Sequence, residues 1–293
     1  MSFNGVSSVS TQTTVLPETS FLRHGRAPAL PTPAEVRARN EESDDIYATS
    51  FDRPPPVKLS SLGLFVKCGD DVTIIEAQTQ KVAYERLQGK LPVPEIFDWA
   101  EDDGQRFIYM SLIEGVTLPD RWHDLIEDER RVVCEELKEM VRALRAFKQD
   151  SHDRFVGSLG KQPLNEIFLT SHPDLRGPFV DFNAVQQFQD ACGIEIDGDT
   201  QIVFTHDDLV PPNNVCHWGP NPKVAAIIDW DQAGWLPSYW EYCKAKQVRL
   251  SPKDFSDVGQ EEWRTQYLPT ILDPVDDEAY YHHWLNLVLS KGI

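Results

Sequence analysis

One stretch of sequence constrains the fold and the chemistry of this chain more than any other. The short apolar run Gln201–Phe204 predicts a strand that leads directly into the polar loop THDDLVPPNN. Two further apolar runs surround a Gly-Pro-Asn-Pro turn and predict a β-hairpin, whose return strand VAAIIDW contains Asp229 near its end. A strand, a polar loop and a hairpin in this order bring the acids and amides of the loop close to Asp229.

The spacing within the loop decides which acid pairs with which amide. Asp208 and Asn213 complete the pattern H-x-D-L-x-P-x-N, which starts at His206. In a phosphotransferase catalytic loop of this pattern, the Asp accepts the proton of the substrate hydroxyl and an Asn five residues later binds Mg²⁺. Asp207 would need a ligand at position 212, which is Pro212. The alternative interpretation is a polar loop with no catalytic role.

Asp229 is the candidate for a second metal ligand. A hairpin returns Asp229 to Asn213, and phosphoryl transfer needs a carboxylate that holds Mg²⁺ beside the base. The alternative is that Asp229 is a turn residue at the end of a strand.

A lysine on an apolar strand marks a second candidate site. Lys67 lies in the predicted strand GLFVKCG, and a buried ammonium needs a partner or a ligand. Glu76, at the start of the next predicted helix, is placed to hold Lys67 toward the α- and β-phosphates of a nucleotide. Glu85 is a second candidate partner two turns later, with Gln80 between them. The alternative is a lysine that extends to solvent beside a helix-capping Glu76.

The first half of the chain alternates strands with helices. Thr32 and Glu35 form a T-x-x-E capping box around Pro33 and predict the first helix. A helix after Lys67 is followed by strand material at 95–99, a turn at Asp103-Gly104 and a strand at 106–112. Strand, helix, strand and strand predict a small α+β lobe. We predict a disordered tail at residues 1–28, a nucleotide-binding N-lobe at 29–113 and a C-lobe at 114–293.

The pattern changes after Asp128. One long helix presents an apolar stripe that we assign to the core rather than to a site: Val133, Leu137, Met140, Val141, Leu144 and Phe147. Residues 165–192 are predicted to be helical with Pro and Gly breaks, and the segment after the hairpin is predicted to be further helix. Tryptophans of the second half are expected to pack its core: Trp218, Trp230, Trp235 and Trp240. Glu241 is expected to be a structural hydrogen-bonding residue.

Charge and composition limit the partners. The 293 residues hold 28 Lys and Arg against 47 Asp and Glu, so the formal net charge is −19. Such a surface repels nucleic acid and anionic membranes and favours cationic small molecules. No apolar run approaches the ~20 residues that a membrane helix needs. The five cysteines form no CxxC pair, so we expect buried thiols in a reducing cytoplasm. The Ser/Thr-rich start leaves a mitochondrial transit peptide as the alternative to a disordered tail.

The chain resembles the aminoglycoside phosphotransferase/choline kinase-like family, and particularly its large fungal branch. The matching phrases run from about residue 29 to residue 247 and keep one order: LPTPAEVRARN, GLFVKCGDDVTIIEAQT, LPVPEIF, FIYMSLIEGVTL, GSLGKQPL, GPF, FTHDDLVPPNN and AAIIDWDQAGWLPSYWEY. The resemblance implies an α+β, bilobal protein-kinase-like fold with a small β-rich N-lobe and a larger, mainly helical C-lobe. It also implies transfer of a phosphoryl group from ATP, with Mg²⁺, to a hydroxyl of a small molecule.

The resemblance assigns roles residue by residue. Asp208 looks like the catalytic base, and His206, which begins the loop, is assigned with it as a catalytic residue. Asn213 and Asp229 look like the metal ligands, and Lys67 with Glu76 looks like the phosphate-binding pair. The adenine ring is expected at the junction of the two lobes, a short apolar segment with exposed backbone groups: Met110, Ser111, Leu112 and Ile113.

Several positions depart from the family pattern. Asp207 stands where such sequences usually have Gly and is expected to add a negative charge beside the base, and Asn214 stands where an aliphatic residue is usual. The stretch 177–204 is shorter than is usual in the family. No GxGxxG precedes Lys67, so only Ser60-Ser61-Leu62-Gly63 is available to cover the phosphates. Two of these departures, Asp207 and the missing glycine-rich loop, motivate an alternative: a pseudokinase that acts as a nucleotide-binding or protein-interaction module without turnover.

Overall fold

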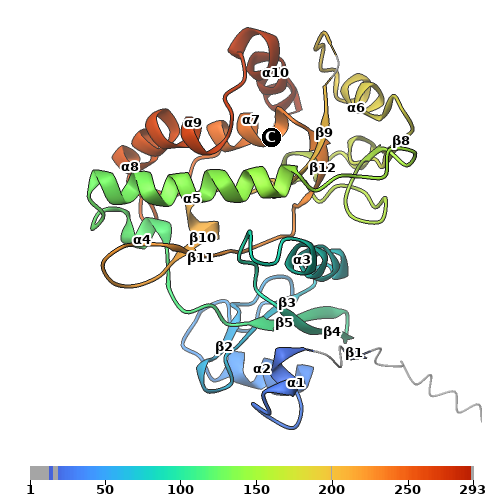
Figure 1. The fold of residues 1–293 in the computed structure, drawn as a ribbon. Coiled ribbons are helices and arrows are strands. Elements are labelled where there is room, and N and C mark those ends of the chain that lie inside the picture. Colours follow the sequence, from blue (N-terminus) through green and yellow to red (C-terminus); the bar gives the residue numbers. More distant parts are fainter. Residues whose placement is uncertain (1–12, 16–18, 199, 292–293) are drawn as a thin grey trace, which may run out of the picture. The chain divides into compact units, whose positions relative to one another are not determined.

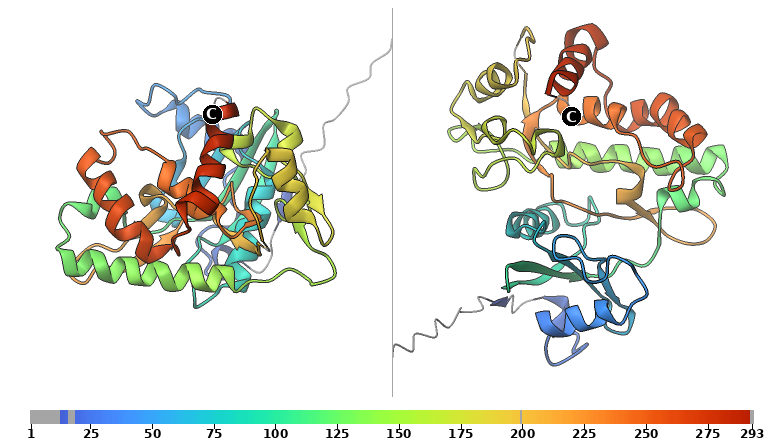
Figure 2. Two further views of the ribbon diagram at one scale, coloured as in Figure 1. Left: turned by 90° about the horizontal axis from the view of Figure 1, so that it is seen from above. Right: turned by 180° about the vertical axis from the view of Figure 1, so that it is seen from behind.

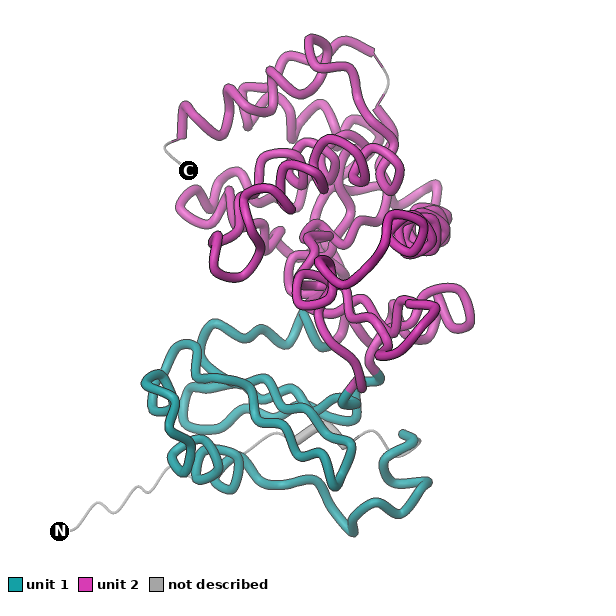
Figure 3. The backbone as a smooth tube through the Cα atoms, turned by 90° about the vertical axis from the view of Figure 1, so that its left-hand side faces the viewer, with its two compact units in different colours: residues 1–77, 95–112 teal, residues 78–94, 113–293 magenta. Residues whose placement is uncertain are grey.

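The structure is a computed structural model that describes residues 13–15, 19–198 and 200–291. Its contacts divide the chain into two compact units, which Figure 3 shows in two colours: residues 1–77 with 95–112, and residues 78–94 with 113–293. The sequence-based division assigned residues 78–94 to the first domain. Their side chains belong to the core of the second unit instead, because Leu87, Leu91 and Val93 are buried there.

The first unit is built on one antiparallel sheet, whose elements are labelled in Figure 1. Its strands, in spatial order, are β1 (Thr13–Val15), β4 (Ile96–Asp102), β5 (Gln105–Ser111), β3 (Leu64–Gly69) and β2 (Val57–Leu59). The predicted turn at Asp103-Gly104 joins β4 to β5. Both residues have positive φ, 50° and 78°, as a two-residue hairpin turn requires. The predicted strand around Lys67 is β3.

Apolar side chains cover both faces of this sheet. On one face, Phe21 of α1 (Ser20–Arg23) and Val36 of α2 (Pro33–Glu41) pack against strand residues such as Phe97 and Phe107. The capping box at the start of α2 is present as predicted, with Thr32 and Glu35 bonding each other's backbone. On the other face, Ala77 of α3 (Ile74–Arg86) belongs to a smaller apolar cluster.

Order begins earlier than the sequence indicated. The prediction of a disordered tail at 1–28 covers residues 1–12 and 16–18, which lie outside the described residues, but it also covers β1 and α1. Phe21 is fully buried, and the backbone and hydroxyl of Ser20 both donate to the Glu95 carboxylate. A helix of four residues carries too little periodicity to be recognised, and its partner lies 75 positions away along the chain.

A buried acid in β4 makes the stability of the first unit depend on pH. Asp98 is 4% exposed, and burial raises the pKa of this carboxyl to about 6, although the hydrogen bond that Oδ1 accepts from the Trp99 N–H opposes the rise. Because the pKa is raised in the folded state, the protonated acid fits the fold and the ionised acid destabilises it. The destabilisation is absent below the ordinary pKa of 3.8, grows as the pH rises, and is complete above about 6.

We therefore expect Asp98→Asn to raise the melting temperature by a few degrees at pH 8 and to leave it unchanged near pH 4. The amide cannot ionise, and its oxygen can still accept the Trp99 N–H. Thermal unfolding at several pH values, with Asp71→Asn as a control at an exposed acid, measures this. A gain that is the same at both pH values would show that ionisation of Asp98 is not the cause.

The second unit is mainly helical. Its long helix α5 (Glu127–Arg145) buries the predicted stripe, from Val133 to Leu144, and lies alongside the later helices in Figures 1 and 2. The remaining helices of this unit are α4 (Leu118–Trp122), α6 (Ala184–Cys192), α7 (Trp240–Gln247), α8 (Asp257–Glu262), α9 (Leu268–Ile271) and α10 (His282–Lys291). Trp122 is a centre of this core, with edge-to-face contacts to Phe255, Trp263 and Tyr267.

Three small sheets complete the second unit. Their strands are β6 (Val116–Thr117) with β10 (Asn214–Cys216) and β11 (Val224–Ile227), β9 (Ile202–Thr205) with β12 (Gly234–Pro237), and β7 (Phe155–Val156) with β8 (Phe179–Val180). β10 and β11 form the predicted hairpin. β12 was predicted as helix and is a strand, because the run between Gly234 and Pro237 pairs with β9 about 30 positions earlier.

Two other expectations about the second unit are wrong. Within 165–192 only α6 is an α-helix. The earlier part contains two short 3₁₀ turns and strand β8, because prolines and glycines leave no run long enough for a helix. Trp218 does not pack the core but is 72% exposed in the turn between β10 and β11, whereas Trp230, Trp235 and Trp240 are buried. In the part of the chain that the structure describes, no helix has the length and apolar character needed to cross a bilayer.

Candidate functional site

The predicted catalytic loop connects two strands that belong to different small sheets. β9 ends at Thr205, a 3₁₀ turn spans Pro211–Asn213, and β10 follows immediately. Asp207 and Asp208 differ sharply within the loop. Asp207 is 1% exposed, whereas Asp208 is half-buried and reaches solvent. Of the two acids, only Asp208 is available to a substrate.

Asp208 and Asn213 are in direct contact, as the five-residue spacing predicts. The side-chain Nδ2 of Asn213 donates to the carboxylate Oδ2 and to the backbone oxygen of Asp208, both at 2.9 Å. Because both contacts use the amide nitrogen, the amide oxygen Oδ1, which is the atom that a metal needs, takes part in neither.

The hairpin brings Asp229 back to the same loop. Asn214 is paired with Ile227 across β10 and β11, and the N–H of Ile228 donates to the backbone oxygen of Asn213 at 2.9 Å. Asp229 follows directly, with φ of 66° and a half-buried side chain. Its negative charge is close enough to raise the pKa of Asp208.

Opposing effects set the pKa of Asp208. Burial raises it, and the charge of Asp229 adds to this, while the ammonium of Lys244 and the hydrogen bond from Asn213 lower it; the net shift is upward. A carboxylate with a raised pKa is a stronger base than an ordinary exposed aspartate.

Both ring nitrogens of His206, the second predicted catalytic residue, contact the backbone. His206 is fully buried, its Nε2 donates to the Ile228 carbonyl at 3.0 Å, and its Nδ1 accepts the Asp208 N–H at 3.3 Å. Burial lowers the pKa of His206, so the ring is neutral. Both ring nitrogens are used by the backbone, and the imidazole therefore links Asp208 to the strand end before Asp229 without reaching a substrate.

The donor set suits Mg²⁺ rather than a metal held by protein alone. Among the residues that the structure describes, no group of three or more His, Cys, Asp or Glu side chains gathers where it could hold a metal. Asn213 and Asp229 each carry a side-chain oxygen, and their backbones are linked through the hydrogen bond from the Ile228 N–H to the Asn213 carbonyl. Mg²⁺ is commonly held by one or two carboxylates together with water and substrate phosphates, so two protein ligands are sufficient.

Lys67 and Glu76 form the predicted pair within the first unit. Lys67 Nζ lies 2.8 Å from Glu76 Oε1, and the two side chains are 20% and 2% exposed. The alternatives have other partners: Glu85 pairs with Lys81, and Gln80 donates to the Pro94 carbonyl. The hydroxyl of Thr73 accepts the Glu76 N–H and so fixes the start of α3.

The segment expected to receive an adenine ring is partly engaged already. The N–H of Ser111 donates to the Glu95 carbonyl and the N–H of Leu112 donates to the Gly63 carbonyl, both at 2.9 Å, so these donors are not available to a base. Met110 is 7% exposed and packs with Ile108 on the sheet. A ring at this segment would depend on its remaining backbone groups, including those of Ile113.

The turn that precedes Lys67 is short and supported from outside. β2 and β3 are joined by the 3₁₀ turn Ser60–Leu62 and by Gly63, which has φ of 57°. The guanidinium of Arg26 donates to the carbonyls of Leu62 and Gly63. This turn replaces the longer glycine-rich loop whose absence the sequence indicates.

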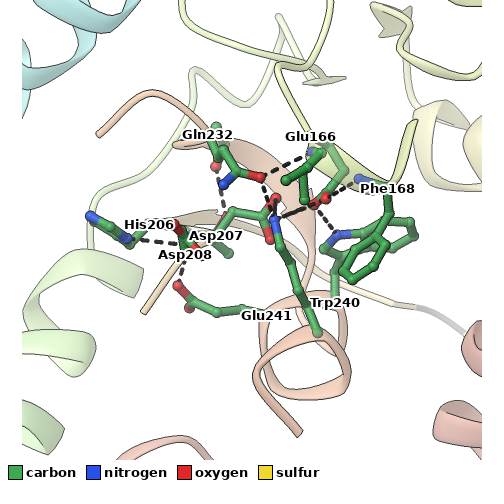
Figure 4. A network of polar contacts seen from close by, with 12 residues as sticks. Glu166, Phe168, His206, Asp207, Asp208, Gln232, Trp240 and Glu241 are labelled. Carbon is green, nitrogen blue, oxygen red and sulfur yellow. Dashed lines mark hydrogen bonds and ion pairs between the residues drawn. The ribbon is translucent and has the colours of Figure 1, made fainter. Parts of the chain in front are cut away.

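The sequence did not predict the buried polar network around Asp207, the residue that precedes the proposed base (Figure 4). Lys244 on α7 is 2% exposed, and its Nζ lies 2.9 Å from the Glu166 carboxylate, 2.6 Å from Gln232 Oε1 and 3.5 Å from Asp207 Oδ2. Glu241, one turn earlier on α7, accepts the Asp207 N–H at 2.9 Å. The structural role expected for Glu241 is thus confirmed.

The surroundings of Asp207 oppose the negative charge that the sequence suggested. Burial and the neighbouring Glu166 carboxylate raise its pKa far above the usual value, and the two carboxyls share a hydrogen bond. For Glu166, burial acts upward, but the Lys244 ammonium outweighs it and lowers the pKa. The upward shift favours the protonated form of Asp207, and the downward shift favours the ionised form of Glu166, which lies 2.9 Å from the Lys244 ammonium.

Comparison with known proteins identifies what this arrangement resembles. The model of the phosphotransferase enzyme family matches residues 74–271, which is more than half of the chain. No curated protein sequence matches. Among solved structures, aminoglycoside phosphotransferase APH(3'')-Id from Streptomyces rimosus ATCC10970, in complex with ADP and streptomycin, is similar with a TM-score of 0.50 and 17% identity. That match covers 80% of this chain and 90% of the other.

A second solved structure is the aminoglycoside-3'-phosphotransferase of type VIII, with a TM-score of 0.49, 16% identity, and coverage of 77% of this chain and 84% of the other. At such identities the similarity concerns the fold. The fold is thus the α+β, protein-kinase-like fold that the sequence predicts.

Proposed function

We propose that this chain, which belongs to the phosphotransferase enzyme family, transfers the γ-phosphate of ATP, with Mg²⁺, to a hydroxyl of a small molecule. The observation that carries the proposal is the contact of Asp208 with Asn213 at the end of a hairpin that delivers Asp229. A base beside two oxygen ligands is the arrangement that phosphoryl transfer to an alcohol needs. The solved relative in complex with ADP and streptomycin supports a nucleotide and a small acceptor.

Each residue has a defined task in this proposal. Asp208 accepts the proton of the acceptor hydroxyl, and its upward-shifted pKa suits it to that task. Asn213 and Asp229 would hold Mg²⁺, which neutralises charge on the phosphate oxygens when it is bound. Lys67, oriented by Glu76, binds the phosphates of the nucleotide. Positioning and charge stabilisation, rather than covalent chemistry, supply the rate.

The acceptor is proposed to be cationic because the formal net charge of −19 attracts cations to the protein surface. The acidic segment 272–278 gives this little local support, since its side chains have other roles. Asp273 is exposed near Arg145, Asp276 caps the following turn, and Asp277 pairs with Lys246. The charge argument therefore rests on the whole surface. We propose no nucleic-acid or membrane partner.

The alternative of a nucleotide-binding module without turnover now rests mainly on one feature. Of its two motives, the extra charge at Asp207 is weakened, because burial and Glu166 raise the pKa of this acid and the Lys244 ammonium lies 3.5 Å from it. The short turn before Lys67 remains and favours weak nucleotide binding over lost catalysis.

We propose that the protein acts in the cytoplasm, where ATP and reduced thiols are both available.

Lys67→Met is expected to weaken the binding of ATP about 10–100-fold, because a charged hydrogen bond contributes roughly 1.5–3 kcal/mol. Titration calorimetry with ATP and with GTP, each with and without Mg²⁺, measures the affinity and the choice of nucleotide. Lys58→Met is the matched control, since Lys58 is exposed on the neighbouring strand β2.

We expect the control to bind ATP as the wild type does. Equal affinities in Lys67→Met and the wild type would remove Lys67 from the nucleotide site. No binding of ATP or GTP by the wild type, with or without Mg²⁺, would contradict the proposed function.

A further inference from the structure

Two side chains of α7, one turn apart, meet the residue that precedes the proposed base (Figure 4). Glu241 Oε1 accepts the Asp207 N–H at 2.9 Å, and Lys244 Nζ lies 3.5 Å from the carboxyl of Asp207. Residues three positions apart share a helix face, so one helix contacts both the backbone and the side chain of Asp207. Asp207 has φ of 61°, in the left-handed region that few residues other than Gly, Asn and Asp enter.

Lys244 also connects segments that are distant in sequence. Its ammonium donates to Glu166, which starts a 3₁₀ turn, and to Gln232, which lies three residues after Asp229. Gln232 Oε1 in turn accepts the N–H of Ile167 at 3.0 Å. One buried cation therefore joins the loop of the base, the segment after the proposed metal ligand and the segment around Glu166.

The Lys244 ammonium and the Glu166 carboxylate form a fully buried ion pair. Glu166 also accepts hydrogen bonds from the Phe168 N–H and the Trp240 indole, so its ionised carboxylate is well solvated by donors. The Lys244 ammonium thus lies against a carboxylate that has several further hydrogen-bond donors, which is the kind of pairing that a buried cation requires. None of these groups has a direct contact with the outside, since Lys244, Glu166 and Asp207 are each at most 2% exposed.

We propose that Lys244 is a positioning residue for phosphoryl transfer: its ammonium, together with Glu241 on the same helix face, holds Asp207 and so fixes the place of the neighbouring Asp208 relative to the segment that carries Asp229. Lys244 reaches no substrate in this proposal and acts through Asp207, Gln232 and Glu166. The inference rests on the proposed function, because it assigns the machinery that supports the proposed base.

The test uses a variant that removes the cation without leaving a buried charge. Lys244→Met alone leaves the Glu166 carboxylate unpaired, so it is expected to lower the melting temperature strongly. The double variant Glu166→Gln/Lys244→Met removes both members of the buried ion pair together and is expected to recover most of the stability. Lys246→Met is the matched control on the same helix, where the lysine pairs with Asp277 near the surface.

The activity readout is Asp208-dependent hydrolysis of ATP with Mg²⁺, in which water takes the γ-phosphate, measured as ADP released. For the double variant we expect kcat to fall about 10–100-fold with unchanged affinity for ATP, because small displacements of a reacting group cost this much. The control should keep the kcat of the wild type. A merely structural lysine would give the double variant a normal kcat once its stability is recovered, and this result would overturn the proposal.

Hydrogen exchange provides a readout that does not depend on activity. In the folded double variant the amides of Asp207 and Asp208 should exchange faster than in the wild type, while those in the middle of α5 should not change. Unchanged exchange at both loop amides would overturn the positioning role. If the wild type transfers no phosphate at all, the proposed function fails, and the exchange result still decides whether Lys244 holds the loop.

Discussion

Asp208→Asn is expected to lower kcat for phosphoryl transfer by about 10²–10⁴-fold, because a correctly placed general base contributes a factor of this size. The asparagine has nearly the same shape, and its side-chain oxygen can still accept the hydrogen bond from Asn213 that Asp208 accepts at 2.9 Å. We therefore expect the fold and the affinity for ATP to change little. Steady-state kinetics with saturating ATP and Mg²⁺, together with a melting curve, measure both effects.

The control for this variant is an acid outside the site. Asp254→Asn changes an exposed carboxyl in a surface turn and should leave kcat unaltered. If Asp208→Asn retained the activity of the wild type, the base would have to be another residue, and the pairing of Asp208 with Asn213 would have a structural purpose only.

Asp229→Ala is expected to reduce kcat by at least about 100-fold and also to weaken the binding of ATP in the presence of Mg²⁺. A metal ion contributes several kcal/mol of charge stabilisation, and it links the protein to the phosphates, so binding and rate depend on the same ligand. Affinity for ATP without Mg²⁺ should not fall. Calorimetric titrations with and without Mg²⁺ separate the two effects.

The two variants should thus differ in which quantity they change, the catalytic rate alone or the rate together with the affinity for ATP. Asp208→Asn loses rate at constant affinity, whereas Asp229→Ala loses both, and only in the presence of the metal. An Asp229→Ala protein that responds to Mg²⁺ as the wild type does would show that Asp229 is not a metal ligand. Asp254→Ala provides the matched removal of an exposed carboxylate.

Local patterns predicted the parts of the fold in which the determining residues lie close together in sequence. The capping box at Thr32 and Glu35, the turn at Asp103-Gly104 and the apolar stripe of α5 are all present. In each case the information lies within one turn or one helix. The contact of Asp208 with Asn213 belongs to the same class, because a five-residue spacing and a 3₁₀ turn bring the two side chains together.

Long-range pairing explains most of what the sequence did not predict. β12 is a strand because it forms backbone hydrogen bonds with β9. α1 is ordered because the backbone N–H of its first residue, Ser20, donates to the Glu95 carboxylate. Nothing within four residues of either element signals this. Trp218 illustrates the opposite error, since an aromatic residue in a hairpin turn has no core to enter.

The meaning of Asp207 could not be obtained from its position in the motif. From sequence alone an acid beside the base adds negative charge, but the structure places Lys244 and Glu166, 37 and 41 positions away, around it. No sequence motif identified Glu166 or Lys244 as part of a site. One local pattern pointed to Lys244: Glu241 and Lys244 lie three positions apart on a helix that begins with the buried Trp240.

Transfer of labelled γ-phosphate from ATP into a metabolite extract, separated by charge, tests the proposed function most directly when wild type and Asp208→Asn are compared side by side. We expect a small molecule to become labelled by the wild type with Mg²⁺ and not by Asp208→Asn, and we expect it to be cationic before phosphorylation. An acceptor that is neutral or anionic would remove the cationic-acceptor proposal alone. The absence of any Asp208-dependent label, from a protein that binds ATP, would contradict phosphoryl transfer and favour a module that only binds nucleotide.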